Sequence, residues 1–351
     1  MRTSSRGDVD PFIVMDVMEA ARQAEASGRH IIHMEVGQPG TPAPEGARRA
    51  LIDAMEAGPL GYTVALGLPE LRARIARLYG EWYGVDLAPS RVVVTGGSSA
   101  AFQLAFISLF EAGEKVAIGD PGYPSYRNIL KALALDPVRI ETTEENRFQP
   151  VPGDLDAPDL AGLLVASPGN PTGTMLDRES LGALMAACAE RGLGFISDEI
   201  YHGIDYGARP VTALELGDQA YVINSFSKYF SMTGWRIGWM VVPEDHVRRI
   251  ERLAQNLFIC PPHASQVAAL AALDCPDELQ ANVATYAKNR EMLLRELPRA
   301  GFTHLAPPDG AFYIYADVSE MTGDSPALAR EILDEAGVSV TPGLDFDPVR
   351  G

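Results

Sequence analysis

The sequence predicts an α/β fold. We expect a three-layer α/β/α large domain with a mostly parallel seven-stranded sheet, plus a smaller α+β domain made from both chain ends. Three observations lead to this prediction. From Arg91 onward, short apolar runs alternate with stretches of helical periodicity. Loops rich in glycine, proline and polar residues follow the apolar runs. At 351 residues, the chain is longer than one average domain, so two lobes are expected.

Before Arg91, the sequence predicts helices and one strand. Helices are expected over about residues 12–27, over 44–58, and from Pro69 onward, where Leu71, Ile75 and Leu78 recur at helical spacing. The strand-like run is Ile31–Val36, and a turn-rich loop follows it. We assign residues 1–43 to an N-terminal arm and part of the small domain.

Seven apolar runs between residues 91 and 242 are expected to form the central sheet. Helices such as 100–110 and 178–191 fill the gaps, and this alternation gives parallel strands covered on both faces. In such sheets, ligands gather at the carboxyl ends of the strands. Residues 44–275 are therefore assigned to a large ligand-binding domain. The predicted strands are Val92–Thr95, Lys115–Gly119, Val138–Glu141, Gly162–Ser167, Gly194–Asp198, Tyr221–Ser225 and Arg236–Val242.

The remaining residues, 276–351, are assigned to a small C-terminal domain. Helical stretches over about 263–273 and 277–297 lead into it. Two strand-like runs, Phe302–Leu305 and Ala311–Ala316, and a helix near 326–336 follow.

Composition excludes several classes of protein. A net charge of -18 opposes binding to nucleic acid and to anionic membrane surfaces. The three cysteines are far apart and the histidines are isolated, so neither a disulfide framework nor a metal site is expected. The start lacks the apolar core of a signal peptide, and no run is long enough to span a membrane. We expect a cytoplasmic protein.

The chemistry centres on one lysine between two apolar strands. Lys228 lies in the loop from Ser225 to Arg236. Burial lowers the pKa of a lysine amine, and a neutral amine forms Schiff bases with aldehydes. Ser225, Ser227 and Arg236 could hold a phosphate beside that amine. An aldehyde that carries a phosphate suggests pyridoxal 5'-phosphate (PLP). The alternative is a surface lysine, with Arg236 in a salt bridge.

Two other strand ends carry residues that suit this cofactor. Gly97, Ser98 and Ser99 open a helix, whose N-terminus favours an anion, although serines there also serve as ordinary caps. Tyr123 follows the next strand and could stack on a flat ring, or could pack on its neighbours in a turn.

The following strand ends add an amide, a carboxylate and a phenol. Asn170 lies between two backbone breakers, where it could also bond only its own backbone. Asp198 ends an apolar strand and needs a partner, for which a protonated ring nitrogen would serve; a helix cap is the alternative. Glu199 is expected to point the other way, towards solvent or a helix cap. Tyr201 could reach a phenolic oxygen on the same ring.

Taken together, these motifs resemble the class I/II aminotransferases of the aspartate aminotransferase fold (PLP fold type I). The resemblance covers nearly the whole chain. It runs through Val36-Gly37-Gln38-Pro39, Tyr62, Gly67-Leu68-Pro69-Glu70-Leu71-Arg72, Asn170-Pro171-Thr172-Gly173, Asp198-Glu199-Ile200-Tyr201, Ser227-Lys228, Gly234-Trp235-Arg236 and Asp309-Gly310-Ala311-Phe312-Tyr313.

The resemblance implies a role for each residue. It implies catalysis by Lys228, Asp198 and Tyr201. It implies substrate contacts at Gly37 and Asn170. Tyr62 resembles a tyrosine that reaches the phosphate of the other subunit, which implies a homodimer. The implied cofactor ligands are Gly97, Ser98, Ser99, Tyr123, Asn170, Asp198, Tyr201, Ser225, Lys228, Arg236 and Tyr62.

The implied reaction is transfer of an amino group from an α-amino acid to a 2-oxo acid, by a ping-pong mechanism through a Schiff base on Lys228. Other reactions on this scaffold stay open, such as C–S β-elimination or a related synthase. A PLP-sensing regulator would need a DNA-binding module, for which the N-terminal stretch is short and the chain too acidic. A non-catalytic interaction protein conflicts with the intact set of Lys228, Asp198 and Arg236.

One part of the family pattern is missing. The family usually carries an arginine near its C-terminus that grips the substrate carboxylate, in a strand after a Pro-Gly loop like Thr341-Pro342-Gly343. Arg350 lies too close to that loop to match it. The alternatives are a truncated chain that lacks the last strand and helix of the small domain, or a lobe that is closed differently. We expect truncation, because Phe312–Ala316 would otherwise leave an open sheet edge.

Overall fold

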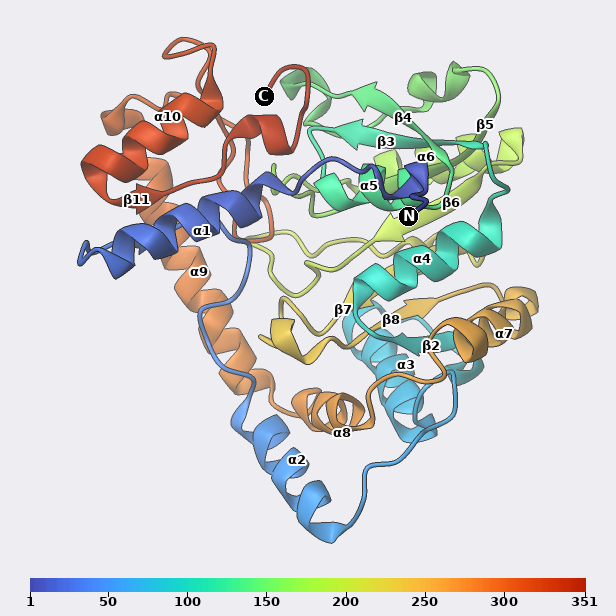
Figure 1. The fold of residues 1–351 in the computed structure, drawn as a ribbon. Helices are drawn as coiled ribbons and strands as arrows, with labels where there is room; N and C mark the ends of the chain where they lie inside the picture. The colour runs from blue at the N-terminus through green and yellow to red at the C-terminus, as the bar shows by residue number, and fades with distance from the viewer.

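A seven-stranded sheet forms the centre of the computed structural model, which describes residues 1–351 (Figure 1). The strand order is β2-β8-β7-β6-β5-β3-β4. Strand β8 is antiparallel to β2 and β7, and all other neighbours are parallel. All seven predicted strands are present with small shifts at their ends. They are β2 (Val92–Thr95), β3 (Lys115–Asp120), β4 (Asp136–Glu141), β5 (Leu160–Ala166), β6 (Gly194–Asp198), β7 (Ala220–Ser225) and β8 (Gly238–Val241).

Helices cover both faces of the sheet, which gives the predicted three layers. Successive strand residues point to opposite faces, so Val92 and Val94 belong to one buried cluster and Val93 to another. The first cluster is covered by α3 (Pro69–Tyr83), α6 (Arg178–Arg191) and α8 (His263–Ala272), with α2 (Glu45–Ala57) packed on α8. The second is covered by α4 (Ser98–Leu109), α5 (Pro124–Ala132) and α7 (Val247–Leu257).

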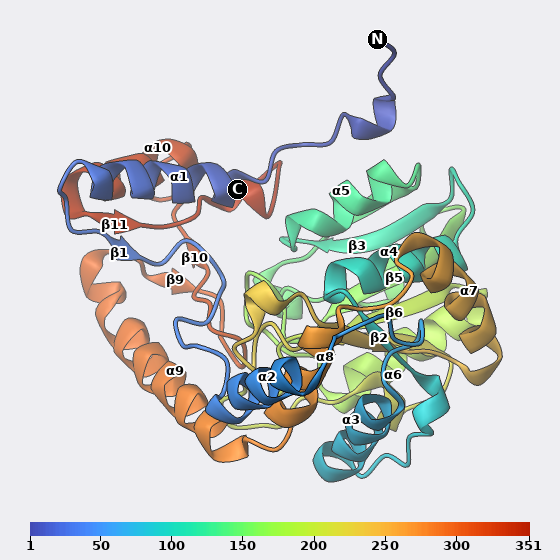
Figure 2. The same ribbon diagram turned by 60° about the horizontal axis from the view of Figure 1, so that its bottom comes forward.

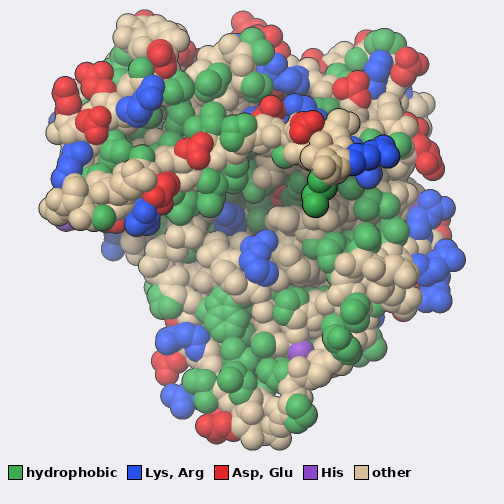
Figure 3. All heavy atoms as spheres, in the orientation of Figure 1, with side chains coloured by type: hydrophobic (Ala, Val, Ile, Leu, Met, Phe, Trp, Pro, Cys, Tyr) green, Lys and Arg blue, Asp and Glu red, His purple; other side chains and the backbone are tan.

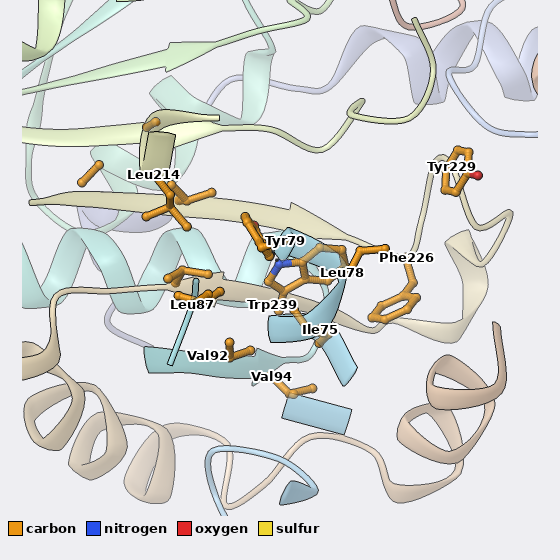
Figure 4. Close-up of a cluster of buried hydrophobic side chains, with 14 of the residues drawn as sticks. Ile75, Leu78, Tyr79, Leu87, Val92, Val94, Leu214, Phe226, Tyr229 and Trp239 are labelled. Atoms are coloured by element: carbon orange, nitrogen blue, oxygen red, sulfur yellow. Dashed lines mark hydrogen bonds between the residues drawn. The ribbon is translucent and has the colours of Figure 1, made fainter. Parts of the chain in front are cut away.

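The core of the first cluster supports the loop that carries Lys228. Trp239 of β8 is fully buried, and its indole nitrogen donates to the hydroxyl of Tyr79 at 3.2 Å (Figure 4). The ring of Phe226 packs against Trp239 with centroids 5.0 Å apart. Since Phe226 is the first residue after β7, this contact fixes the start of the loop.

A smaller unit lies beside the sheet and is built from both chain ends (Figure 2). Helix α1 (Ile13–Ala26) and strand β1 (Ile32–His33) come from the N-terminal part. Strand β1 pairs in parallel with β11 (Val338–Ser339), and β9 (His304–Leu305) pairs antiparallel with β10 (Ala316–Asp317). The other helices are α9 (Pro276–Glu296), which leads to this unit, and α10 (Ser325–Glu331), which continues as a π-helical turn over Ile332–Ala336. The expected boundaries at residues 43/44 and 275/276 stay predictions.

A carboxylate near the C-terminus ties the two chain ends together. Asp345 is fully buried and accepts hydrogen bonds from the backbone nitrogens of Ile13 and Val14, at 3.1 and 3.2 Å. Those nitrogens begin α1 and have no partner within the helix. Asp345 therefore caps α1 from more than 330 residues away along the chain.

Three predicted strands of the small unit were wrong in extent. Phe302–Leu305 forms a strand only at His304–Leu305. Ile31–Val36 forms a strand only at Ile32–His33. Ala311–Ala316 contributes only Ala316 to β10, because Gly310 and Ala311 bond to the large unit instead: their nitrogens donate to the carbonyls of Gly173 and Ile204, both at 2.9 Å. Local apolar patterns do not show such distant partners.

Short 3-10 helices connect the larger elements. They are Ser5–Gly7, Pro89–Arg91, Glu144–Asn146, Pro152–Asp156, Ala213–Glu215, Thr233–Trp235, Glu244–His246, Pro298–Ala300 and Gly343–Asp345. None of the helices combines the length and the apolar character that crossing a membrane would require.

Candidate active site

Lys228 is the centre of the site. Its Nζ donates to the carbonyl oxygen of Gly37 at 2.5 Å and lies 5.7 Å from the centroid of the Tyr201 ring. Burial lowers the pKa of the amine from 10.5 to about 8, and the nearby Asp198 carboxylate opposes that shift. The other lysines differ, since Lys115 and Lys131 pair with aspartates and Lys288 is exposed.

Asp198 ends β6 and is almost completely buried. Its Oδ2 accepts a hydrogen bond from the hydroxyl of Tyr126, and its Oδ1 accepts from the backbone nitrogen of Ile200 at 3.1 Å. Burial raises the pKa of Asp198 to about 6, against these hydrogen bonds. The side chain therefore has donors on both oxygens and a lysine amine nearby, as a carboxylate at a buried strand end requires.

The residues predicted to bind a phosphate lie together. Gly97 precedes α4 with a φ of 82°, and a Cβ built on it would lie 2.5 Å from Nη2 of Arg236. Ser98 and Ser99 form the first turn of α4, whose backbone N–H groups point toward its N-terminus. Arg236 forms no salt bridge, and its Nη1 donates only to the carbonyl of Thr233 at 3.0 Å. A helix N-terminus beside an unpaired guanidinium suits an anion.

Ser225 ends β7 within a buried hydroxyl pair. Its Oγ lies 2.9 Å from the Oγ of Ser227 and accepts from the Ser227 nitrogen at 3.1 Å. These contacts shape the backbone immediately before Lys228.

Aromatic side chains pack against one another on the elements that form the site. Tyr201 and Tyr313 share a hydrogen bond of 2.5 Å between their hydroxyls. Tyr123 packs edge-on against Tyr126, with ring centroids 5.3 Å apart, and against Phe12 at 5.9 Å. These contacts create a site with mostly uncharged walls.

Gly37 contacts Lys228, and Asn170 lies in the loop after β5. The Oδ1 of Asn170 is buried and has no hydrogen-bond partner, which leaves one end of its amide available. A Cβ on Gly37 would lie 1.9 Å from the hydroxyl of Tyr313, so only glycine lets this loop pass so close to the ring.

Two residues of the sequence analysis lie apart from this group. Tyr62 is 85% exposed on the loop between α2 and α3. Arg350 bonds to Asp347, to Glu141 and to the backbone carbonyls of Asp120 and Thr142, at the end of β3 and β4. Within this chain, neither side chain contacts Lys228.

The prediction that Glu199 faces solvent or a helix cap is confirmed in its second form. The side chain does not face solvent, because it is completely buried. Its Oε1 accepts from the hydroxyl of Ser197 at 3.1 Å and from the nitrogen of Ala213 at 2.8 Å, so it does serve a helix start, that of the 3-10 helix Ala213–Glu215.

Two site residues, Tyr126 and Tyr313, were not predicted from the sequence. Tyr126 holds Asp198, and its position three residues after Tyr123 at the start of a helix is a weak signal of a shared face. Tyr313 holds Tyr201 and lies within the quoted Asp309–Tyr313 motif, but no local pattern gives its role, because its partners lie more than 100 residues away.

The fold and the loop lysine define a known class of enzyme. The chain superposes with a TM-score of 0.92 on a structure of aspartate aminotransferase from Thermus thermophilus with maleate. The two sequences are 29% identical, and the match covers 99% of this chain and 93% of that one. The family model for aminotransferase class I and II matches residues 29–347. The chain therefore belongs to the class I and II aminotransferases, a family of PLP-dependent transaminases.

More similar relatives agree with this assignment. The valine–pyruvate aminotransferase of Mycobacterium tuberculosis is 46% identical, over 100% of this chain and 92% of that protein. A solved chain from Silicibacter pomeroyi is 68% identical and superposes with a TM-score of 0.96, covering 100% of this chain and 92% of that one. The resemblance inferred from the sequence is thus confirmed at the level of fold, family and enzyme class.

Proposed function

We propose that this aminotransferase binds PLP at Lys228 and moves an amino group from an α-amino acid to a 2-oxo acid by a ping-pong mechanism. The observation that carries the proposal is the environment of the Lys228 amine. It is largely buried, has its pKa lowered to about 8, and lies beside Asp198 and the carbonyl of Gly37. A neutral amine in such a place can react with an aldehyde.

The site fits the phosphate of PLP. Gly97, Ser98 and Ser99 would bind it through backbone N–H groups at the start of α4, with the hydroxyl of Ser225 nearby. Arg236 would add a charged contact, because its guanidinium is free of carboxylates and lies against Gly97.

Side chains of suitable chemistry are also available for the ring of PLP. Tyr123 would stack on it. Asp198 would pair with its protonated nitrogen, and the unpaired amide end of Asn170, together with Tyr201, would bond the ring oxygen. When bound, PLP supplies an electron-withdrawing ring that stabilises negative charge at the substrate Cα.

A side chain of this protein would then transfer the proton on the substrate Cα. Lys228, once released, is the general base that takes the proton from Cα and returns it, a contribution of about 10²–10⁴-fold in rate. The carbonyl of Gly37 orients its Nζ. The pKa of about 8 leaves part of the amine neutral near pH 7, as a base requires.

Removing the amine tests this role. We expect Lys228→Ala to abolish turnover, whereas Lys288→Ala, which changes an exposed lysine on α9, should behave like the unaltered enzyme. Initial rates at several fixed concentrations of the second substrate should give the parallel double-reciprocal lines of a ping-pong mechanism. Near-normal turnover of Lys228→Ala would refute the assignment.

For substrates, we propose neutral amino acids such as valine as donors and pyruvate as an acceptor. The support is the M. tuberculosis relative, together with the aromatic walls made by Phe12, Tyr123 and Tyr313. Asp198 and Arg236 carry charges that act on Lys228, and the phosphate of the cofactor would pair with Arg236. A second carboxylate, as in aspartate, would therefore lie among tyrosines at a desolvation cost.

Comparing donors tests this proposal. We expect kcat/KM for L-valine with pyruvate to exceed that for L-aspartate with the same acceptor by at least about tenfold, which corresponds to about 1.4 kcal/mol. A preference for aspartate would contradict the substrate class but leave the role of Lys228 intact. The C–S β-lyase or synthase alternative has no observation in its favour, since the named relatives include transaminases.

We also propose that the enzyme is a homodimer in which Tyr62 reaches the partner's phosphate site. In one chain, Tyr62 is exposed, as are the apolar side chains of Ile52 and Met55 on α2 and of Val64 on the loop that follows. Figure 3 shows hydrophobic side chains gathered over this lower part of the molecule, where α2 and the segment after it lie. Contiguous exposed apolar residues of this kind mark interaction surfaces.

A further inference from the structure

Two loops of the candidate site are joined by a residue that has no role so far. One loop begins at Ser167, after β5, and carries Asn170. The other is the turn after β6, which carries Tyr201 and then His202. The proposed function needs Asn170 and Tyr201 to converge on the same ring oxygen, so the spacing of these two loops matters.

His202 connects the two loops through its ring. The side chain is completely buried. Its Nε2 lies 2.9 Å from the carbonyl oxygen of Ser167. Because a carbonyl oxygen can only accept, Nε2 must carry the proton. His202 therefore donates across from the Tyr201 turn to the residue where the Asn170 loop begins.

Tyr83 of α3 fixes this arrangement from the other side. Its hydroxyl lies 2.7 Å from Nδ1 of His202. With the proton on Nε2, Nδ1 of a neutral ring can only accept, so Tyr83 donates. The hydroxyl thus selects the one tautomer that can bond Ser167. The guanidinium of Arg209 lies over the Tyr83 ring, 5.1 Å from its centroid, and holds the tyrosine in place.

The surroundings keep the ring neutral. Burial lowers the pKa of His202 to about 3, helped by the positive charge of Arg209. The other titratable group nearby is Glu199, whose Oε2 lies 3.6 Å from Nδ1 and is too distant to bond it. Burial raises the pKa of Glu199 to about 8, so it is mostly protonated at neutral pH.

Ser167 is held at each of its other polar groups too. Its nitrogen donates to the carbonyl of Asp198 at 3.1 Å, and its Oγ accepts from the nitrogen of Leu176 at 2.9 Å. The contact from His202 is the one that links Ser167 to the turn containing Tyr201. We propose that His202 is a positioning residue, which, with its tautomer set by Tyr83, holds the Asn170 loop and the Tyr201 turn at the spacing that PLP binding requires. This inference rests on the proposed function.

Two substitutions at position 202 separate the two ring nitrogens. In His202→Gln, the longer side chain can bring an amide N–H to the place of Nε2 and keep the bond to Ser167. In His202→Asn, the shorter amide reaches only the place of Nδ1, so the Ser167 carbonyl loses its donor. We expect the loss of this buried hydrogen bond to weaken the affinity of the protein for PLP by about tenfold.

The measurement is the dissociation constant of PLP by absorption titration. A second readout is the pH at which the visible band of the loaded enzyme titrates. We expect the dissociation constant to rise about tenfold for His202→Asn, with a shifted band titration, and to stay within about threefold of the unaltered protein for His202→Gln. Tyr83→Phe, which frees the tautomer, should weaken PLP binding in the same direction and serves if His202→Asn does not fold.

The outcomes are distinct. If the unaltered protein does not bind PLP, the proposed function fails. If it binds PLP and a folded His202→Asn matches it in affinity and band titration, the inference about His202 is overturned. It is also overturned if His202→Gln and His202→Asn weaken binding equally, or if Tyr83→Phe leaves affinity unchanged.

Discussion

At the scale of single residues, the site brings two opposite pKa shifts together. Burial lowers the pKa of Lys228 to about 8 and raises that of Asp198 to about 6. Both groups therefore titrate near neutral pH, where neither would in water. This is the condition in which an amine can act as both nucleophile and base, and perturbed pairs of this kind concentrate at functional sites.

Glu199 offers a pH test at the same scale. Its pKa is raised by burial from 4.5 to about 8, so the folded state holds the proton more tightly than the unfolded state. The resulting stability is fully present below pH 4.5 and is lost as the pH rises through 8. We expect Glu199→Gln, which resembles the protonated acid, to lose less unfolding free energy than the unaltered protein between pH 6 and pH 9.

Urea unfolding at the two pH values measures this difference, which should be a few kcal/mol. Ser197→Ala is a suitable control, because it removes one partner of Glu199 and keeps the carboxyl group. Identical pH dependence in Glu199→Gln and the unaltered protein would show that this carboxyl is not held protonated.

The sequence predicted some of these residues and missed others, for a physical reason. Lys228, Asp198 and Asn170 follow strand ends, and the topology of a parallel sheet brings strand ends together. Tyr126 and Tyr313 act through hydrogen bonds to partners far away in the sequence. Their contacts depend on how α5 and the 309–313 segment pack, which no local period encodes.

At the scale of elements, the strands of the large sheet were predicted nearly in full, whereas the short strands were predicted too long or, for β11, not at all. Six of the seven sheet strands are rich in apolar residues, so their positions follow from pattern. The edge strand β4 differs, because three of its six residues are charged. Strands β1, β9, β10 and β11 have two residues each and exist only because a partner lies beside them. Helices α5 and α7 were not predicted as separate elements.

The loop after β7 depends on one aromatic anchor. Phe226 is completely buried and contacts both Trp239 and Phe230, with centroid distances of 5.0 and 4.8 Å. We expect Phe226→Ala to lower the free energy of unfolding by about 3–5 kcal/mol, because it leaves a cavity in the core. It should also weaken PLP binding, since Lys228 is two residues away.

Denaturant unfolding and a PLP titration measure the two effects. Phe258→Ala is a matched control, since Phe258 is 38% exposed at the end of α7, and it should change stability by less than about 1 kcal/mol. If Phe226→Ala were as stable as the control, the core would not support the lysine loop as described.

At the scale of the whole molecule, the exposed apolar region around Tyr62 predicts a dimer. Val64 is 56% exposed in that region, and a charge there would be desolvated in an interface. We expect Val64→Asp to shift the protein towards monomers in sedimentation experiments.

Tyr62→Phe should leave the dimer intact and weaken PLP binding, because only the hydroxyl is lost. A monomeric unaltered protein that binds PLP tightly would contradict this proposal.

The most direct test of the central claim is a visible absorption spectrum of the purified protein with PLP, before and after addition of L-valine. We expect a visible band from PLP attached to Lys228, loss of that band when L-valine is added, and no such band in Lys228→Ala. A spectrum that remains that of free PLP would contradict the account, as would a band of equal strength in Lys228→Ala.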